Sequence, residues 1–226
     1  MYNNMALQSF YNPDESIIEI GVDEVGRGPM FGRVYTAAVI LPKDNSFKHN
    51  LMKDSKKFSS WKKLKATAEY IKDNCIAYSI SYEDEESIDK NNILNATHIA
   101  MHKAIKNLID YSKNNLILVD GNNFKPLTYF DNNTETIKEI DSLCVTGGDN
   151  KYTAIAAASI LAKVERDIYI EELCNKYPKL DELYHLLKNK GYGTKNHIDA
   201  IKANGITKWH RKSFGICKNS TIIDII

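Results

Sequence analysis

Two adjacent carboxylates near the start of the chain have the types and spacing needed to bind a divalent metal. Asp23 and Glu24 follow an apolar run, residues 17–22, that is typical of a β-strand. Neighbouring side chains of a strand point to opposite faces, so an Asp-Glu pair at a strand end can reach two positions around one cation. An Asp-Glu-x-Gly stretch is also common in plain turns, so these residues alone leave both interpretations open.

A glycine-arginine-glycine loop follows this acidic pair. Gly26 and Gly28 flank Arg27, which lets the backbone approach a ligand closely and leaves the guanidinium free to bind an anion. A metal-binding carboxylate pair beside such a loop is typical of phosphodiester chemistry. The glycine spacing misses the dinucleotide-binding pattern by one residue, and no Gly-Lys-Ser/Thr follows, which excludes a P-loop.

Two further carboxylates are expected at strand ends and loop mouths. Asp120 follows a short apolar run, and Asp149 follows two glycines and precedes an alanine-rich helical stretch. Together with Asp23 and Glu24 they could surround one or two hard cations, which prefer oxygen ligands. Asp149 could instead be an ordinary helix N-cap, and Asp167, inside the same helical stretch, is the competing fourth ligand.

Length and charge indicate a single large domain, or a domain with a smaller appendage, that could bind a polyanion. The chain has 226 residues and a net charge of only +1. Its basic residues are nevertheless concentrated, with ten Lys/Arg against three acids over residues 176–218 and a second cluster over 53–65. Either cluster alone could be a solvated helix face, but together they suit a protein that holds nucleic acid.

The cysteines and the hydropathy pattern indicate a cytoplasmic protein. The four cysteines are far apart and form no Cys-x-x-Cys pair, which argues against a zinc site and against a disulfide framework. The N-terminus does not resemble a signal peptide, and no apolar run is long enough to cross a membrane. We therefore expect no membrane association.

The order of apolar patterns predicts an α/β fold with a mixed five-stranded sheet flanked by helices. Two strands joined by the glycine loop should be antiparallel because the connection is too short for a crossover helix. Later strands alternate with helices, which places helices on both faces of the sheet. The expected strands are 17–22, 34–41, 75–82, 116–119 and 136–145, and the expected helices are 60–71, 92–111 and 152–175, followed by two or three shorter ones.

Several motifs along the chain resemble those of ribonuclease HII, the type 2 ribonucleases H. They occur in that family's order, and they span nearly the whole chain, from about residue 17 to residue 214. One such motif would be a weak signal, whereas this many in register is specific. The matching segments are Gly21–Pro29, Asp54–Lys57, Val119–Asn122, Gly148-Asp149, Ala156–Lys163 with Arg166-Asp167, Gly191–Thr194, and His210-Arg211 with Ser213-Phe214.

The resemblance implies a fold, an activity and a cofactor. A ribonuclease-H-like catalytic domain would cover residues 16–176, a small C-terminal helical substrate-binding region 177–218, and a tail 219–226. The activity would be hydrolysis of the RNA strand of RNA–DNA hybrids and incision on the 5′ side of single ribonucleotides in duplex DNA. Two Mg²⁺ or Mn²⁺ ions would assist, leaving 3′-hydroxyl and 5′-phosphate ends.

The resemblance also implies roles for individual residues. The four metal-binding carboxylates of the family fall on Asp23, Glu24, Asp120 and Asp149, which favours Asp149 over Asp167. The loop of Gly26, Arg27 and Gly28 would read the ribose 2′-hydroxyl, the group that distinguishes RNA from DNA. Tyr192 would pack on the deoxyribose at the RNA–DNA junction, and Lys56 and Lys57 would contact phosphates without specifying bases.

The chain departs from the family pattern at a few positions. Arg33 stands where proline is usual, with Tyr35 close behind it, and Gly147 often has a lysine counterpart. Arg33 could add a phosphate contact or be a plain surface residue, and the apolar C-terminal tail could bind a partner or pack on the chain. The family is generally monomeric, and a tether to a replication protein is left open.

Two rival functions remain at this stage. A non-catalytic hybrid-binding module would keep the fold, although such proteins usually lose one of the carboxylates. Ribonuclease HIII shares the carboxylates but carries an N-terminal substrate-binding domain. Only about sixteen residues precede the first expected strand here, so we expect the type 2 enzyme.

Overall fold

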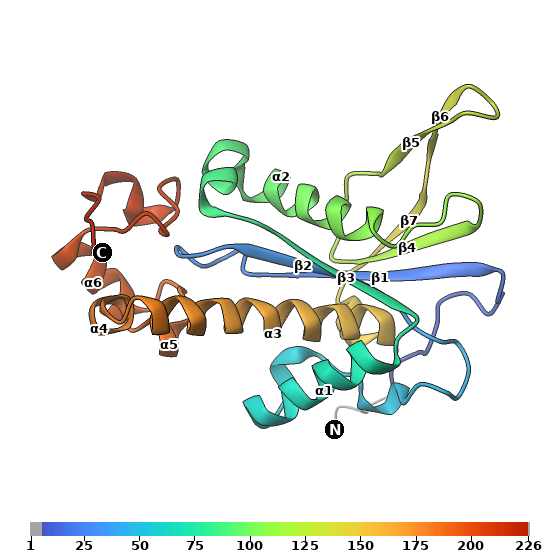
Figure 1. Cartoon of the computed structure of the whole chain (residues 1–226), viewed down its shortest axis with the longest axis horizontal. Helices are drawn as coiled ribbons and strands as arrows, with labels where there is room; N and C mark the ends of the chain where they lie inside the picture. Colours follow the sequence, from blue (N-terminus) through green and yellow to red (C-terminus); the bar gives the residue numbers. More distant parts are fainter. Residues whose placement is uncertain (1–5, 226) are drawn as a thin grey trace. The chain divides into compact units, whose positions relative to one another are not determined.

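The computed structural model describes residues 6–225, so the last residue of the expected tail, Ile226, lies outside the described part. The strands are β1 (Ile17–Val25), β2 (Val34–Ile40), β3 (Ala77–Glu83), β4 (Asn114–Asp120), β5 (Thr128–Asp131), β6 (Thr136–Glu139) and β7 (Asp141–Val145) (Figure 1). The helices are α1 (Trp61–Asn74), α2 (Glu85–Lys106), α3 (Thr153–Lys176), α4 (Lys179–Tyr184), α5 (Leu186–Asn189) and α6 (Lys195–Asn204). Within the described residues, no helix combines the length and the apolar character needed to cross a membrane.

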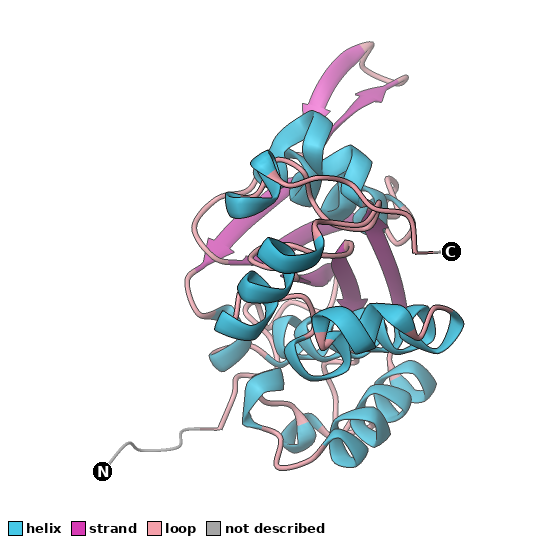
Figure 2. Cartoon of the chain, turned by 90° about the vertical axis from the view of Figure 1, so that its left-hand side faces the viewer, coloured by secondary structure: helices cyan, strands magenta, loops and turns pink. Residues whose placement is uncertain are grey.

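The main sheet has the strand order β3-β2-β1-β4-β7. Strands β1 and β4 are parallel, with Val22 opposite Val119, and β4 and β7 are parallel, with Asp120 opposite Val145. Helices lie on both faces of the sheet (Figures 1 and 2). The α/β fold with a mixed five-stranded sheet flanked by helices is therefore confirmed.

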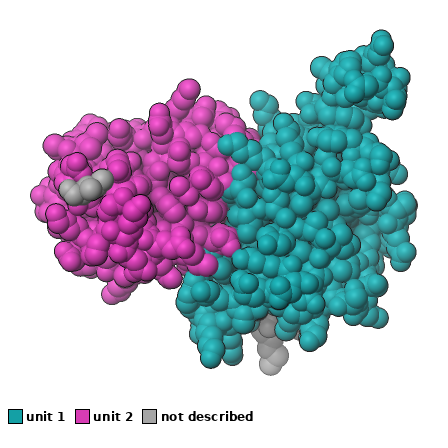
Figure 3. All heavy atoms as spheres, viewed as in Figure 1, with its two compact units in different colours: residues 1–24, 36–81, 101–164 teal, residues 25–35, 82–100, 165–226 magenta. Residues whose placement is uncertain are grey.

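The chain divides into two compact units (Figure 3). Unit 1 comprises the residues up to 24 together with 36–81 and 101–164, and unit 2 comprises 25–35, 82–100 and the residues from 165 onward. Each unit is assembled from separate stretches of sequence. The expected domains, 16–176 and 177–218, follow a different division and stay a prediction.

The core of unit 1 lies on both faces of the main sheet. On one face, Met101 of α2 packs with Val22 of β1 and Val119 of β4. On the other face, Ile155 of α3 packs with Leu118 of β4. Successive residues of β4 thus serve opposite faces, as the two-residue period of a strand requires. Because both faces are buried, the ends of β1 and β4 are held in fixed register.

The close approach of β1 to the start of α3 depends on Gly21. A Cβ added at Gly21 would lie 2.3 Å from the backbone carbonyl carbon of Ala154, which cannot move without shifting the helix. We expect Gly21→Ala to destabilise the protein by about 1–3 kcal/mol or more, the cost of overpacking a dense core. Thermal unfolding measures this. Gly193→Ala is the control because its Cβ would meet only the Met30 side chain, and equal melting of the two variants would contradict the prediction.

Unit 2 is built around the last third of the chain. Its core joins Phe31 to Ile170 of α3, Leu180 of α4, Leu186 of α5 and Ile201 of α6. Short helices therefore pack on the segment that follows the glycine loop, and this packing positions that segment.

The described part of the C-terminal tail packs on unit 2. The Ile206 amide donates to the Thr221 carbonyl at 2.8 Å, and the Ile223 amide donates to the Ile206 carbonyl at 2.7 Å. Ile225 is only 8% exposed. Of the two roles left open for the tail, packing on the chain is the one observed.

The expected strand 136–145 is wrong as a single element. It divides into β6, which pairs with β5 in a separate two-stranded hairpin, and β7, which joins the main sheet. The division occurs at Ile140, whose amide donates to the Leu127 carbonyl at 2.9 Å and whose side chain is buried. The strand pattern of residues 136–145 is uninterrupted, so it does not indicate that the pairing changes from β5 to β4 at Ile140.

Candidate active site

Three neighbouring parallel strands deliver the predicted carboxylates to one edge of the sheet. Val22 of β1 lies opposite Val119 of β4, so Asp23 and Asp120, the next residue of each strand, lie side by side at the same end of the sheet. Asp149 follows β7 after a short turn, in the 3-10 helix Gly148–Asn150. This edge, at the carboxyl ends of the strands, is where open α/β sheets bind ligands.

A hydrogen bond ties the turn before Asp149 to Asp120. The Gly148 amide donates to Asp120 Oδ1 at 2.6 Å. A Cβ at Gly148 would lie 2.6 Å from Ile155 Cδ1, so a larger residue there would force the end of the Ile155 side chain to move. Gly147 has φ of 63°, a left-handed conformation that also favours glycine.

Asp23 and Asp149 are both influenced by the charge of Asp120. Burial raises the pKa of Asp23 well above its ordinary value, Glu24 and Asp120 raise it further, and a hydrogen bond from Ser159 opposes them. Burial also raises the pKa of Asp149, with a further contribution from Asp120. Carboxylates in this arrangement repel one another, and a divalent cation among them would remove that repulsion.

The donor set fits a hard cation, although the described residues do not form a closed metal site. Within residues 6–225, no three His, Cys, Asp or Glu side chains are arranged closely enough to hold a metal ion. The candidate donors, Asp23, Glu24, Asp120 and Asp149, are all carboxylates of unit 1, the ligand type that Mg²⁺ and Mn²⁺ prefer. The competing candidate, Asp167, belongs to unit 2. The ligand assignment stays a prediction.

Two lysines stand beside Asp149. They belong to the 3-10 helix Ser55–Lys57, which Asp54 caps by accepting a hydrogen bond from the Lys56 amide at 2.9 Å. Lys57 Nζ donates to Oδ1 of Asn150, the residue after Asp149. The cation of Lys56 partly offsets the rise in the Asp149 pKa. Both lysines are thus placed next to a carboxylate of the site, as phosphate contacts would require.

In unit 2, one buried arginine organises the glycine-arginine-glycine loop. Arg211 is completely buried, and burial lowers its pKa to about 9. Its guanidinium donates to four backbone carbonyls of the loop segment, which are those of Gly26 at 2.6 Å, Arg27 at 3.0 Å, Pro29 at 2.7 Å and Gly32 at 2.8 Å.

These contacts determine the orientation of the loop amides. Because a trans peptide unit has its N–H opposite its C=O, the Arg27 and Gly28 amides point away from Arg211. Gly26 has φ of 93°, and a Cβ there would lie 2.3 Å from Arg166 Nε. The loop therefore turns its carbonyls inward and these two amides outward, an arrangement suited to a hydroxyl or phosphate oxygen.

Tyr192 lies against the same loop. A Cβ at Gly28 would be 3.7 Å from Tyr192 Cε1, and the Met30 amide donates to the Gly191 carbonyl at 2.9 Å. The Arg166 guanidinium carbon lies 5.7 Å from the centre of the tyrosine ring. Tyr192 remains 42% exposed. The structure thus brings together Tyr192 and the loop, two motifs far apart in sequence.

Sequence reasoning missed the roles of the two buried arginines. Arg166 is completely buried and donates to the carbonyls of Phe31 at 3.2 Å, Lys190 at 3.0 Å and Arg33 at 3.3 Å. Arg166 and Arg211 lay inside recognised motifs, but both looked like ordinary basic residues. Their partners are backbone carbonyls, which no side-chain pattern reveals.

The unusual Arg33 packs among aromatic rings. Its guanidinium carbon lies 3.9 Å from the ring centre of Tyr82 and 4.5 Å from that of Tyr169. Arg33 Nη1 donates to the Tyr35 hydroxyl at 3.4 Å. The two departures at positions 33 and 35 therefore contact each other, and the stacking accounts for Arg33 without a ligand.

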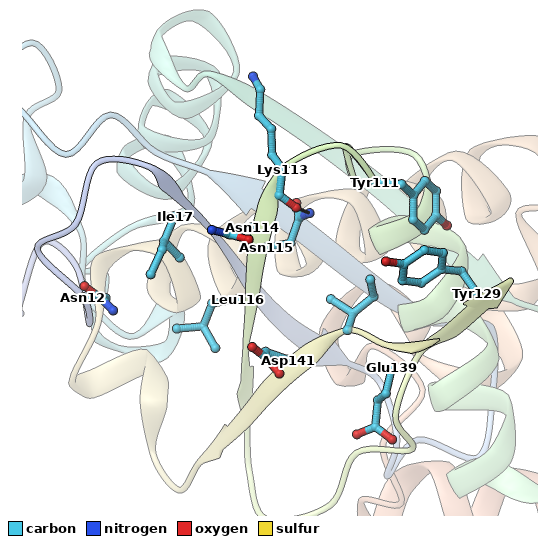
Figure 4. A pocket seen from close by; sticks show the side chains of 11 residues that line it. Asn12, Ile17, Tyr111, Lys113, Asn114, Asn115, Leu116, Tyr129, Glu139 and Asp141 are labelled. Carbon is cyan, nitrogen blue, oxygen red and sulfur yellow. Dashed lines mark hydrogen bonds between the residues drawn. The ribbon is translucent and has the colours of Figure 1, made fainter. Parts of the chain in front are cut away.

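A pocket in unit 1 lies at the opposite ends of the strands from the carboxylates (Figure 4). It is lined by Ile17 of β1, Leu116 of β4 and Asp141 of β7, together with Tyr111 and Tyr129. The two tyrosine rings are 4.8 Å apart. Ile17 and Leu116 lie near the starts of β1 and β4, whereas Asp23 and Asp120 lie toward the other ends of these strands, so the pocket is separate from the candidate active site.

Comparison with known sequences identifies the same family throughout. The family model described as ribonuclease HII matches residues 20–217. The ribonuclease HII of Parabacteroides distasonis is 45% identical over 87% of this chain and 89% of its own length. That of Christiangramia forsetii is 41% identical over 96% of this chain and 98% of its own.

Solved structures share the fold at lower sequence identity. The ribonuclease H2 of Pyrococcus horikoshii covers 88% of this chain and 95% of its own, with a TM-score of 0.68 and 22% identity. The Archaeoglobus fulgidus ribonuclease HII, solved in complex with PCNA, covers 88% and 96% with a TM-score of 0.66 and 23% identity. A Bst ribonuclease HIII in complex with Mn²⁺ covers 83% and 70%, with a TM-score of 0.57 and 17% identity.

Proposed function

The chain belongs to the ribonuclease HII family, metal-dependent endonucleases that act on RNA–DNA hybrids, and from this we propose that it also incises duplex DNA 5′ of a single embedded ribonucleotide. The observation that carries the proposal is the position of Tyr192 beside Gly28 of the Gly26–Gly28 loop within unit 2, where a Cβ on Gly28 would lie 3.7 Å from the tyrosine ring. A loop that contacts a ribose beside a ring that packs on the next sugar can detect an RNA–DNA junction.

We propose that Asp23, Glu24, Asp120 and Asp149 hold two divalent cations, Mn²⁺ or Mg²⁺. Bound there, such ions supply an activated water and neutralise the charge that develops on the departing 3′-oxygen. The carboxylates orient this centre, and the Gly148 amide holds Asp120 in place. The products would carry 3′-hydroxyl and 5′-phosphate ends.

Each unit is proposed to contribute its own contacts with the substrate. The outward amides of Arg27 and Gly28 would bond to the ribose 2′-hydroxyl, which accepts as well as donates. Lys56 and Lys57 would contact phosphates and so position the duplex without reading its bases. Residues 177–218 are proposed as the substrate-binding region, in keeping with their excess of basic side chains.

Tyr192→Ala tests the proposal. We expect kcat/KM to fall about tenfold or more on a duplex with one ribonucleotide, since a stacked aromatic ring contributes about 1–3 kcal/mol to nucleic-acid binding. The loss on a uniform RNA–DNA hybrid should be smaller. The control is Tyr192→Phe, which keeps the ring and should retain the preference. A wild-type protein that leaves the single-ribonucleotide duplex uncut in Mn²⁺ would refute the proposal.

A further inference from the structure

Behind Tyr192, two completely buried histidines form a chain of hydrogen bonds. His197 Nδ1 lies 3.0 Å from the Tyr192 carbonyl oxygen, and His197 Nε2 lies 3.3 Å from His210 Nε2. At the far end, His210 Nδ1 lies 3.0 Å from the Thr207 backbone nitrogen. All four residues belong to unit 2. The chain therefore connects a buried backbone amide to the carbonyl of the exposed tyrosine.

The proton positions in this chain follow from its two ends. A carbonyl can only accept, so His197 Nδ1 carries a proton; a backbone amide can only donate, so His210 Nδ1 does not. The Thr207 hydroxyl, also 3.0 Å from His210 Nδ1, can donate to the same bare nitrogen. If both rings are neutral, His210 Nε2 carries its proton and donates it to the bare Nε2 of His197. The Tyr192 carbonyl determines the tautomer of His197, and the Thr207 amide independently determines that of His210. The two tautomers are compatible with a hydrogen bond between the two Nε2 atoms.

Both rings are held in this neutral state by their surroundings. Burial lowers the pKa of His197, and burial together with the neighbouring His197 lowers that of His210 to about 3. The rings packed against His210 are those of Phe31 and Tyr184, whose centres lie 4.9 Å and 4.8 Å away. A second proton on His197 would place two N–H groups face to face between the rings, and a second proton on His210 would place one against the Thr207 amide N–H.

The chain fixes the backbone of Tyr192 while its side chain stays accessible. Its amide donates to the Asn189 carbonyl at 2.9 Å, and its carbonyl accepts from the Thr194 amide at 2.8 Å as well as from His197. The backbone sets the direction in which a side chain leaves, and small misplacements of a positioning group can cost large factors in rate. Of these three hydrogen bonds, the one from His197 comes from a side chain, so a mutation can remove it.

We propose that His197 is a positioning residue that holds Tyr192 in place for selection of the RNA–DNA junction, and that His210 holds His197 in the required tautomer. This inference rests on the role proposed above for Tyr192. It assigns a function to two histidines that no sequence pattern links, since they come from α6 and from the segment after it.

Two variants of His197 separate its two hydrogen bonds. An asparagine amide can occupy the place of Nδ1 and still donate to the Tyr192 carbonyl, whereas a glutamine amide reaches the place of Nε2 and keeps only the contact with His210. We expect His197→Gln to lower kcat/KM about tenfold on the single-ribonucleotide duplex, the scale of one lost hydrogen bond, and about twofold or less on a uniform hybrid. His197→Asn should stay within about threefold of wild type on both.

A double-mutant cycle shows whether His197 acts through Tyr192. If it does, His197→Gln combined with Tyr192→Ala should have the same substrate preference as Tyr192→Ala alone, because coupled residues are not additive. Losses that add, or that are equal on both substrates, would overturn the inference and assign His197 a purely structural role. Circular dichroism of each variant verifies that it is folded.

Nitrogen-15 NMR of histidine-labelled protein tests the chain without any substrate. At pH 7 we expect neutral rings, with the proton on Nδ1 of His197 and on Nε2 of His210. Any other tautomer, or a charged ring, would overturn the inference whatever the activity. By contrast, unchanged preference in Tyr192→Ala with the expected tautomers would overturn the function proposed for Tyr192, and the positioning role with it.

Discussion

Asp120→Asn should abolish cleavage and at the same time stabilise the protein at neutral pH. We expect kcat to fall by about 10³-fold or more, since metal ions held by the carboxylates would contribute several kcal/mol to stabilising the charge of the transition state. The fold should survive, because asparagine Oδ1 can still accept the hydrogen bond from the Gly148 amide. Cleavage of a labelled hybrid in Mn²⁺ measures the first effect, and thermal unfolding measures the second.

The expected stabilisation follows from the direction of two pKa shifts. The charge of Asp120 helps to raise the pKa of Asp23 and of Asp149. A carboxyl whose pKa is raised by folding stabilises the fold at low pH and loses that contribution as the pH rises through its folded value. At neutral pH the ionised groups therefore destabilise the fold, and removing the charge of Asp120 reduces that cost.

The effect of Mn²⁺ on stability and substitutions of other aspartates test whether Asp120 is a metal ligand. Mn²⁺ should raise the melting temperature of the wild type, because a ligand that binds only the folded state stabilises it, and it should raise that of Asp120→Asn less. Asp141→Asn, at the start of β7, is the control and should leave activity unchanged. Asp149→Asn should resemble Asp120→Asn, whereas Asp167→Asn should keep measurable turnover. Activity of Asp120→Asn within tenfold of wild type would rule out the ligand assignment.

The carboxylate edge of the site was predictable because it depends on strands. The apolar run before Asp120 is continuous, as a buried strand requires, the run before Asp23 is interrupted only by Glu19 and Gly21, and the carboxyl ends of parallel neighbours meet at one edge. The position of each carboxylate then follows from the strand it ends. The contact of Asp120 with Gly148 could not be predicted, because it depends on how β7 approaches β4.

The hairpin and the start of α2 could not be predicted, because the local sequence pattern at each of them is misleading. Residues 136–145 have a strand pattern throughout, yet the first part pairs with β5 and the second with β4. Helix α2 was expected to begin at Asn92, but a helical turn already begins at Glu85. Asn92 has φ of 62° and ψ of 163°, so it interrupts the helix there. The sequence pattern therefore indicates the helical segment after Asn92 and misses the helical turn before it.

The buried polar network of unit 2 could not be predicted from the sequence for a different reason. Arg211, Arg166 and His197 all bond to backbone groups, which are present at every residue and leave no trace in the side-chain pattern. A run such as His210 to Lys212 looks like an exposed basic segment. Only a tertiary structure shows that its central arginine is completely buried.

Arg211→Met should unfold unit 2 and abolish cleavage with it. The substitution would leave four backbone carbonyls of the loop segment without their donors, at about 1–3 kcal/mol for each buried group. Even with partial access of water, a loss on the order of 5 kcal/mol approaches the whole stability of an ordinary domain. Urea unfolding measures the loss, and hydrogen exchange should localise it to unit 2.

Arg211→Lys distinguishes the geometry of the guanidinium from its charge. Lysine keeps the positive charge, but its single ammonium cannot reach carbonyls spread from Gly26 to Gly32, so we expect an intermediate loss of stability. Lys212→Met, next to it and exposed, is the control and should unfold like the wild type. Arg27→Ala should lower cleavage with little change in stability, since Arg27 is exposed and alanine keeps the backbone carbonyl that accepts from Arg211. A fully stable Arg211→Lys would mean that charge alone supports the loop, because the forked donor geometry would then be dispensable.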